Sequence, residues 1–218
     1  MGLQQKLENF TLNEDTRKKL LSGSKDAPVE FEDIARIALA GYFLVTSGKE
    51  EIKVYPTCVE FYYHEEEKNG IKDPVVYHKN PKDARKNKPV FPFGFLNNHV
   101  SGIDITFEKG NCPKKAVRAS MLIREFEVDG KPESRSTMMY EALYQQASVF
   151  DGFSIKWVDG EKEVAVEAFV RKNVAEYNDK GEKKLLKDFP EAVSTSNKKY
   201  VQDLRCWQFK KIVDSDKN

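Results

Sequence analysis

The chain has 218 residues, of which 39% are hydrophobic and 33% charged, which suits one domain of generous size with a polar surface. Its 36 Lys and Arg residues nearly balance 35 Asp and Glu residues, so nucleic-acid binding would need a local basic patch. Three widely spaced cysteines form neither a disulfide framework nor a CxxC metal motif, and no window reaches transmembrane length. We therefore expect a soluble, cytoplasmic protein that does not enter the membrane.

The first 28 residues are predicted to form a helical appendage. Thr11 and Glu14 have the spacing of a capping box, and the short helix that follows should end near Ser22. Nothing in this segment decides whether it binds a partner. Residues 29–218 are expected to form a single domain.

A helix and a hairpin are predicted to precede the central part of the chain. From Phe31 to Ala40, apolar residues recur at helical spacing, and Gly41 should end that helix. A strand then begins at Tyr42, and a turn over residues 47–50 leads into a longer strand.

The stretch from Tyr55 to His78 carries the strongest indication of a site. It begins with β-branched and aromatic residues that predict a strand, yet Glu60 lies in the middle of that run. An unpaired carboxylate is costly to bury, and a carboxylate held in apolar surroundings near Tyr62 and His78 is one way to build a general base. The alternative is that Glu60 lies on the exposed face of an edge strand.

Two connections are rich in basic residues. Either they are solvated loops, or they bind phosphate groups of a nucleic acid without reading its sequence. The first, over residues 79–89, contains Lys79, Lys82, Arg85, Lys86 and Lys88. The second, over residues 109–118, contains Lys109, Lys114, Lys115 and Arg118.

The segment from Val90 to Phe107 is predicted to contain two apolar strands, separated by the polar residues 97–99. In the second strand, alternation should place Asp104 and Thr106 on the face opposite the two isoleucines. This segment therefore offers one apolar and one polar side.

The remaining elements add strands and one core helix. Residues 119–128 form a buried strand in which Arg124 either pairs with a neighbouring glutamate or presents a fixed cation at a site. A helix is expected over residues 136–147, with strands after it and at the end of the chain. Strands outnumber helices and alternate little with them, which predicts an α+β fold: a largely antiparallel, curved sheet with flanking helices.

Taken in order, several motifs resemble those of the alkyladenine (3-methyladenine) DNA glycosylase family. They span roughly residues 30–213: D-I-A-R-I-A-L-A-G-Y-F-L-V, V-E-F-Y, D-P-V-V-Y-H, A-S-M-L-I-R-E-F-E-V, Y-E-A-L-Y-Q-Q-A-S-V-F-D-G-F-S-I and D-L-R-C-W-Q-F. The resemblance implies the methylpurine DNA glycosylase fold. It also implies hydrolysis of the N-glycosidic bond of alkylated or deaminated purines in double-stranded DNA, by a monomer that uses water and no metal or other cofactor.

The resemblance also assigns roles to residues. Glu60 falls on the carboxylate that activates water, and Tyr62 on the aromatic ring that stacks on the flipped base. His78 falls on the histidine that contacts the substrate, and Arg124 on an arginine near the DNA backbone. Phe93 and Phe95 are further candidates for contact with the base.

Two positions depart from the family pattern. Asn98, beside a histidine, occupies the region of the tyrosine that fills the gap left by the flipped base, and it is a poor wedge. Asp104 falls on or near an asparagine that screens substrates, so its charge should alter the choice of base. A catalytically inactive or diverged module that binds nucleic acid or a small ligand remains an alternative, as does an unrelated interaction domain.

Overall fold

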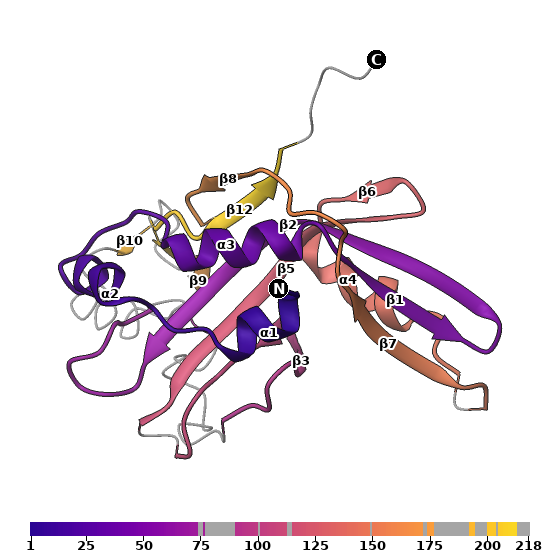
Figure 1. The fold of residues 1–218 in the computed structure, drawn as a ribbon, viewed down its shortest axis with the longest axis horizontal. Helices are drawn as coiled ribbons and strands as arrows, with labels where there is room; N and C mark the ends of the chain where they lie inside the picture. The colour runs from indigo at the N-terminus through magenta and orange to yellow at the C-terminus, as the bar shows by residue number, and fades with distance from the viewer. Residues whose placement is uncertain are drawn as a thin grey trace.

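The fold is α+β and is built around one large, curled antiparallel sheet (Figure 1). The computed structural model describes residues 1–73, 76, 90–99, 101–112, 115–148, 150–171, 174–176, 192–194, 200–203 and 205–212. The helices are α1 (Leu3–Glu8), α2 (Glu14–Leu21), α3 (Val29–Ala38), the 3₁₀ turn η3 (Ser136–Met138) and α4 (Met139–Tyr144). The strands are β1 (Tyr42–Ser47), β2 (Glu50–Glu65), β3 (Leu96–His99), β4 (Gly102–Thr106), β5 (Val117–Val128), β6 (Lys131–Glu133), β7 (Phe153–Val158), β8 (Val166–Phe169), β9 (Val174–Glu176), β10 (Ala192–Ser194), β11 (Tyr200–Asp203) and β12 (Gln208–Lys211).

Strand β2 is the centre of the sheet. The strand order is β3-β4-β5-β2-β1-β7, and β12 also pairs with β2 and carries β8 on its other edge. One edge of β2 is covered by β5, while β1 and β12 share the other. Two register shifts between β2 and β5, around Pro56, Cys58 and Val59, mark a β-bulge that bends the pair. Glu60 therefore does not lie on an edge strand, and that alternative is wrong.

The main core lies between this sheet and α1–α3. Helix α3 buries Phe31, Ile34 and Ala35 completely, as its apolar spacing predicts. Phe31 stacks on Phe61 of β2 with ring centroids 4.6 Å apart, and it meets Trp207 edge to face. These contacts fix α3 across the middle of the sheet.

The N-terminal segment belongs to the same core. Leu3, Leu7 and Phe10 are buried, and Phe10 stacks on Phe31 of α3. Helix α2 occupies the predicted position, but its N-cap is Asn13, whose side chain accepts a hydrogen bond from the Thr16 amide. The first 28 residues thus contribute apolar side chains to the interior of the protein.

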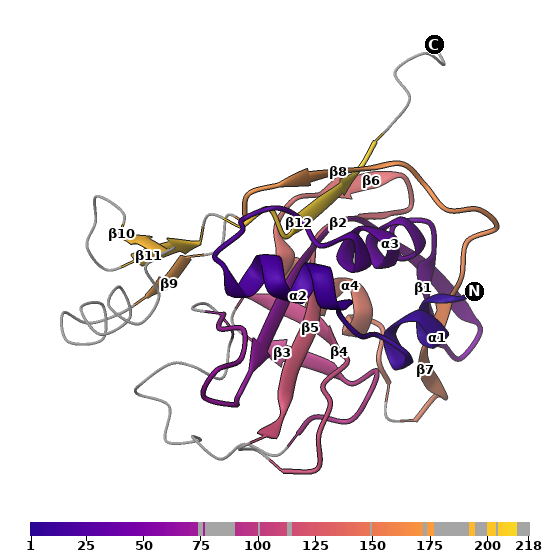
Figure 2. The same cartoon turned by 60° about the vertical axis from the view of Figure 1, so that its left-hand side comes forward.

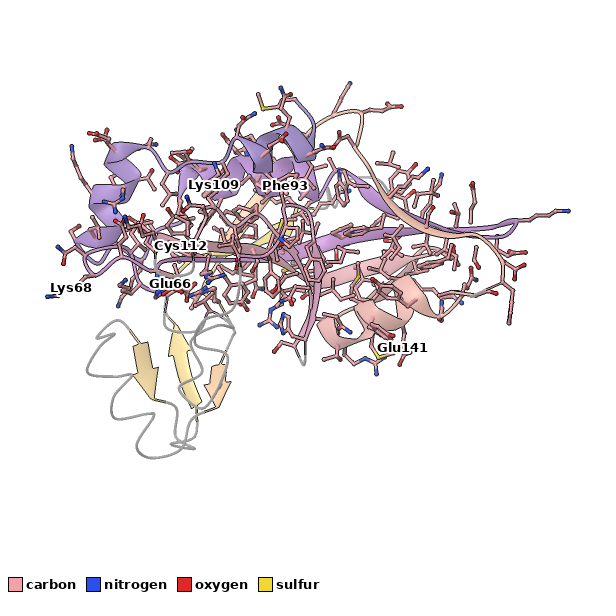
Figure 3. The ribbon with its side chains drawn as sticks, turned by 90° about the horizontal axis from the view of Figure 1, so that it is seen from below. Glu66, Lys68, Phe93, Lys109, Cys112 and Glu141 are labelled. Atoms are coloured by element: carbon pink, nitrogen blue, oxygen red, sulfur yellow. The ribbon has the colours of Figure 1, made fainter. Side chains whose placement is uncertain are left out.

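The second side of the sheet has different covering elements. Figure 3 shows α1–α3 on one side of the sheet and α4, with the three-stranded sheet β10-β11-β9, on the other. In Figure 2 these three strands lie beside the large sheet, away from α4. Helix α4 buries Met139, Ala142 and Leu143, which confirms the core stripe expected for this helix.

The sequence predicted that the polar residues 97–99 separate two strands, and this prediction is wrong. They lie within β3, which pairs with β4 in a hairpin that forms one edge of the large sheet. Gly102 begins β4 with φ of 132°, and a Cβ atom there would lie 2.8 Å from the carbonyl oxygen of Ser136. The glycine therefore allows η3 to approach the hairpin closely.

Candidate functional site

The strands of the large sheet have one apolar and one polar side. On β2, Val59, Phe61 and Tyr63 enter the main core, and alternation directs Glu60 and Tyr62 to the other side. We call that other side the polar face. Its members are Glu60, Tyr62, His64, Asp104, Thr106, Arg118, Ser120, Arg124 and Gln208, placed together by strand register and by side-chain contacts.

Glu60 is the centre of the polar face and is completely buried. Its Oε1 accepts a hydrogen bond from the Tyr62 hydroxyl at 2.6 Å, and its Oε2 accepts one from Arg124 Nε at 2.8 Å. A carboxylate has about four acceptor positions, so these two bonds leave capacity for a water molecule or a ligand. The sequence predicted a buried carboxylate with an aromatic neighbour, and the structure adds its counter-ion.

Arg124 reaches Glu60 because of the β-bulge. Glu125 pairs with Cys58 and Ile123 with Val59, which leaves Arg124 between them without a register partner on β2. Bulges often redirect a side chain beside a functional site. The partner of Arg124 is therefore Glu60, not Glu125 or Glu127, and 18% of the Arg124 side chain is exposed to solvent.

The charge states of this cluster follow from burial and from proximity. Burial lowers the pKa of Arg124, but the nearby Glu60 carboxylate more than compensates, so the pKa is raised and the guanidinium stays charged. Burial, followed by the charge of Glu60, raises the pKa of Tyr62 well above its usual value. Tyr62 therefore remains protonated and serves as a hydrogen-bond donor.

A second carboxylate, Asp104, lies two strands from Glu60. Both residues are opposite Leu122 of β5 in their registers, so their Cα atoms are about 10 Å apart on the same face. Asp104 is completely buried, and its Oδ2 lies 3.1 Å from His99 Nε2 and 3.4 Å from Asn97 Nδ2. Asn97 donates a hydrogen bond to this oxygen, and the His99 ring lies beside it.

Three buried oxygen atoms of this face lack a hydrogen-bond partner within the part of the chain that the structure describes. They are Asp104 Oδ1, Ser120 Oγ and Gln208 Oε1. Each residue is at most 5% exposed. Buried polar atoms are nearly always paired, so each of these oxygens can take one further hydrogen bond, from water or from a ligand.

A third cluster of charged residues, which was not predicted from the sequence, lies against the ring of Tyr62. Asp73 accepts hydrogen bonds from Arg171 at 2.9 Å and from Arg205 at 3.3 Å, and all three side chains are buried. The Arg171 guanidinium also lies 5.2 Å from the Tyr62 ring centre and 4.9 Å from that of Trp207. Only the Asp-Pro pair at residues 73–74 was a sequence signal, and it did not indicate these arginines.

The predicted aromatic and hairpin residues lie at the sheet edge. Phe93 and Phe95 are 39% and 44% exposed, and Phe91 stacks on Phe95 with ring centroids 5.3 Å apart. The Thr106 hydroxyl donates to the Pro92 carbonyl and the Thr106 amide donates to the Phe95 carbonyl, which fixes this loop to β4. Asn98 is exposed on β3, on the side of the strand opposite Asn97.

The predicted phosphate contacts are placed only in part. Arg118 lies in β5 rather than in a loop, and its buried guanidinium contacts Glu66 at 3.4 Å and Glu108 at 2.8 Å. Lys115 is exposed. His78, Lys79, Lys82, Arg85, Lys86, Lys88 and Lys114 lie outside the described residues.

Three further findings concern metal binding, membrane-spanning helices and similarity to known proteins. Among the described residues there is no group of three or more His, Cys, Asp or Glu side chains arranged to hold a metal ion. No helix in the described part of the chain is both long enough and apolar enough to cross a membrane. Comparison of the chain with protein-family models, with curated proteins and with solved structures finds no match.

Proposed function

We propose that this protein hydrolyses the N-glycosidic bond of altered purines in double-stranded DNA, with Glu60 as the residue that activates water. The observation that supports this most directly is the setting of Glu60. It is a completely buried carboxylate in a central strand, held by Tyr62 and Arg124, with acceptor capacity left over. The sequence resemblance to the alkyladenine DNA glycosylases points to the same three residues.

In the proposed reaction, Glu60 accepts a proton from a water molecule as the water oxygen forms a bond to the sugar C1′. The bond between C1′ and the base nitrogen breaks, and its electron pair leaves with the base. A cationic alkylated base departs neutral and Glu60 then releases its proton to solvent, whereas a neutral base takes up one proton from solvent in exchange for the proton that Glu60 releases. The sugar gains positive charge in the transition state, which the adjacent carboxylate stabilises.

Tyr62 and Arg124 would position the carboxylate and water. The Tyr62 hydroxyl remains protonated and so keeps donating to Oε1, which directs the carboxylate. Arg124 donates to Glu60 through Nε only, so its terminal amino groups can contact a DNA phosphate from the exposed side of the cluster. Lys115 is exposed and is a further candidate for a phosphate contact.

Single-turnover excision tests this proposal. Duplexes that contain hypoxanthine, 1,N6-ethenoadenine or 3-methyladenine would be incubated with the parent protein and with Glu60→Gln. Glu51→Gln, at an exposed position of the same strand, is the matched control for loss of one charge. We expect excision by the parent and the control, and a loss of about 10²–10⁴-fold in Glu60→Gln. Absence of excision by the parent, or full activity of Glu60→Gln, would overturn the proposal.

A second function, a non-catalytic module that binds nucleic acid, is favoured by one observation. Both oxygens of Glu60 already accept hydrogen bonds, and the side chain is closed to solvent in this structure. A carboxylate in that state can serve to order the polar face without reacting. Binding of intact DNA with a steep salt dependence, without excision of any base, would identify the protein as such a module.

A further inference from the structure

The three unpartnered atoms of the polar face limit the chemistry of any ligand that it binds. We infer that Asp104 selects a nucleobase that presents an N–H donor, such as the amino group of an adenine-type base, over a base whose edge only accepts hydrogen bonds. This inference deepens the proposed function by naming the class of base, and it rests on that function for its identification of a base as the ligand.

The orientation of the Asp104 carboxylate supports the inference. The backbone amide of Ser101 donates to His99 Nδ1 at 3.2 Å, so a neutral imidazole carries its proton on Nε2, which lies 3.1 Å from Asp104 Oδ2. Asn97 offers its amide to the same oxygen. Oδ2 thus accepts from Asn97, while Oδ1 is a preorganised acceptor without a donor among the described residues.

The surroundings of Asp104 suit a flat ring. Phe95 precedes Asn97 by two residues, so alternation directs it to the polar face, where its ring is 44% exposed and backed by Phe91. Nucleobases stack on such exposed rings. Ser120, on the neighbouring strand, adds a hydroxyl without a partner that can donate or accept.

The separation of the two carboxylates matches a nucleoside. Their Cα atoms are about 10 Å apart, with Leu122 between them in register. A purine edge at Asp104 would therefore place the sugar toward Glu60. Val76 and Tyr62 pack on Leu122 in this structure, so the ring would enter from the exposed edge at Phe95 and displace the Val76 side chain.

Calorimetric titration of the full chain with two nucleosides tests the inference without any cleavage step. The first is 2′-deoxyadenosine, whose N6 amino group donates. The second is 1,N6-etheno-2′-deoxyadenosine, in which the same nitrogen is part of a ring and can only accept. A hydrogen bond to a buried carboxylate predicts that 2′-deoxyadenosine binds about 10- to 100-fold more tightly.

Asp104→Asn gives a second result that a purely structural role would not produce. Asn97 donates to the Oδ2 position, so the new amide should direct its oxygen to Asn97 and its NH₂ group to the ligand. We expect this variant to prefer the etheno nucleoside, which reverses the order of affinities. Glu51→Gln, which removes one exposed charge, should keep the order of the parent.

Equal affinities in the parent, a preference for the etheno nucleoside, or no binding of either nucleoside at millimolar concentration would overturn the inference. The relative affinity of the parent protein for the two nucleosides tests the inference even where a melting curve shows that Asp104→Asn does not fold. Excision that depends on Glu60, with no preference in binding, would refute only the role of Asp104. A preference in binding without excision of any base would refute only the proposed reaction.

Discussion

Replacing Arg124 with methionine tests whether the buried ion pair organises the polar face. Methionine keeps much of the side-chain volume but leaves the completely buried Glu60 without its counter-charge. Removing one partner of a buried pair costs about 3–5 kcal/mol, and the 18% exposure of Arg124 places this pair near the lower limit. We therefore expect a loss of about 3 kcal/mol in the free energy of unfolding at pH 7, which corresponds to a melting point about 6–12 °C lower.

Urea unfolding, followed by the fluorescence of the two tryptophans, measures this loss. The double variant Glu60→Gln/Arg124→Met removes both charges and should recover about 2 kcal/mol of the loss at pH 7. A loss below about 1 kcal/mol, or no recovery in the double variant, would refute this reasoning.

Further measurements examine the neighbouring contacts. Tyr62→Phe removes the donor to Glu60 and should lower the free energy of unfolding by about 1–3 kcal/mol; an unchanged urea midpoint would contradict this. Asp73→Asn removes the buried carboxylate that accepts from Arg171 and Arg205 and should lower the free energy of unfolding by about 3–5 kcal/mol in the same assay; a loss near that of a surface substitution would disprove the role of this network. Because burial, followed by the charges of nearby glutamates, raises the pKa of Cys58 to about 12, maleimide at about pH 8 should label the other two cysteines of the native protein and spare Cys58, as mass spectrometry would show. Labelling of Cys58 before unfolding would contradict its burial. Leu7→Ala should cost about 2–5 kcal/mol, whereas a cost below about 1 kcal/mol would mean that α1 does not stabilise the core.

Period-two alternation was sufficient to predict the two sides of the central strands. Alternation placed Asp104 and Thr106 on the face opposite the two isoleucines, and both residues are on the polar face. Helix α3 was equally clear, because its apolar residues recur at helical spacing. Both patterns are local in the sequence, so they can be recognised without knowledge of the tertiary structure.

Contacts that depend on long-range pairing could not be predicted in this way. The sequence left Arg124 either paired with a neighbouring glutamate or presented as a fixed cation at a site, and its partner, Glu60, lies on the adjacent strand beside a bulge. The Asp73, Arg171 and Arg205 network joins residues separated by 98 and 132 positions, and no local pattern relates them. The sequence predicts a connection at residues 97–99, whereas they lie in β3. A strand with one buried polar side lacks the apolar alternation by which strands are recognised.

The position of β12 has a consequence for the order in which the protein folds. Residues 58–60 pair with residues 208–210, so this side of the Glu60 ladder closes only after residues 208–210 have left the ribosome. Until then, the edge of β2 that β12 covers offers unpaired amide and carbonyl groups to any other strand nearby. Pairings between such distant segments close slowly, so we expect nascent chains shorter than about 210 residues to be the form most prone to aggregation and most dependent on chaperones.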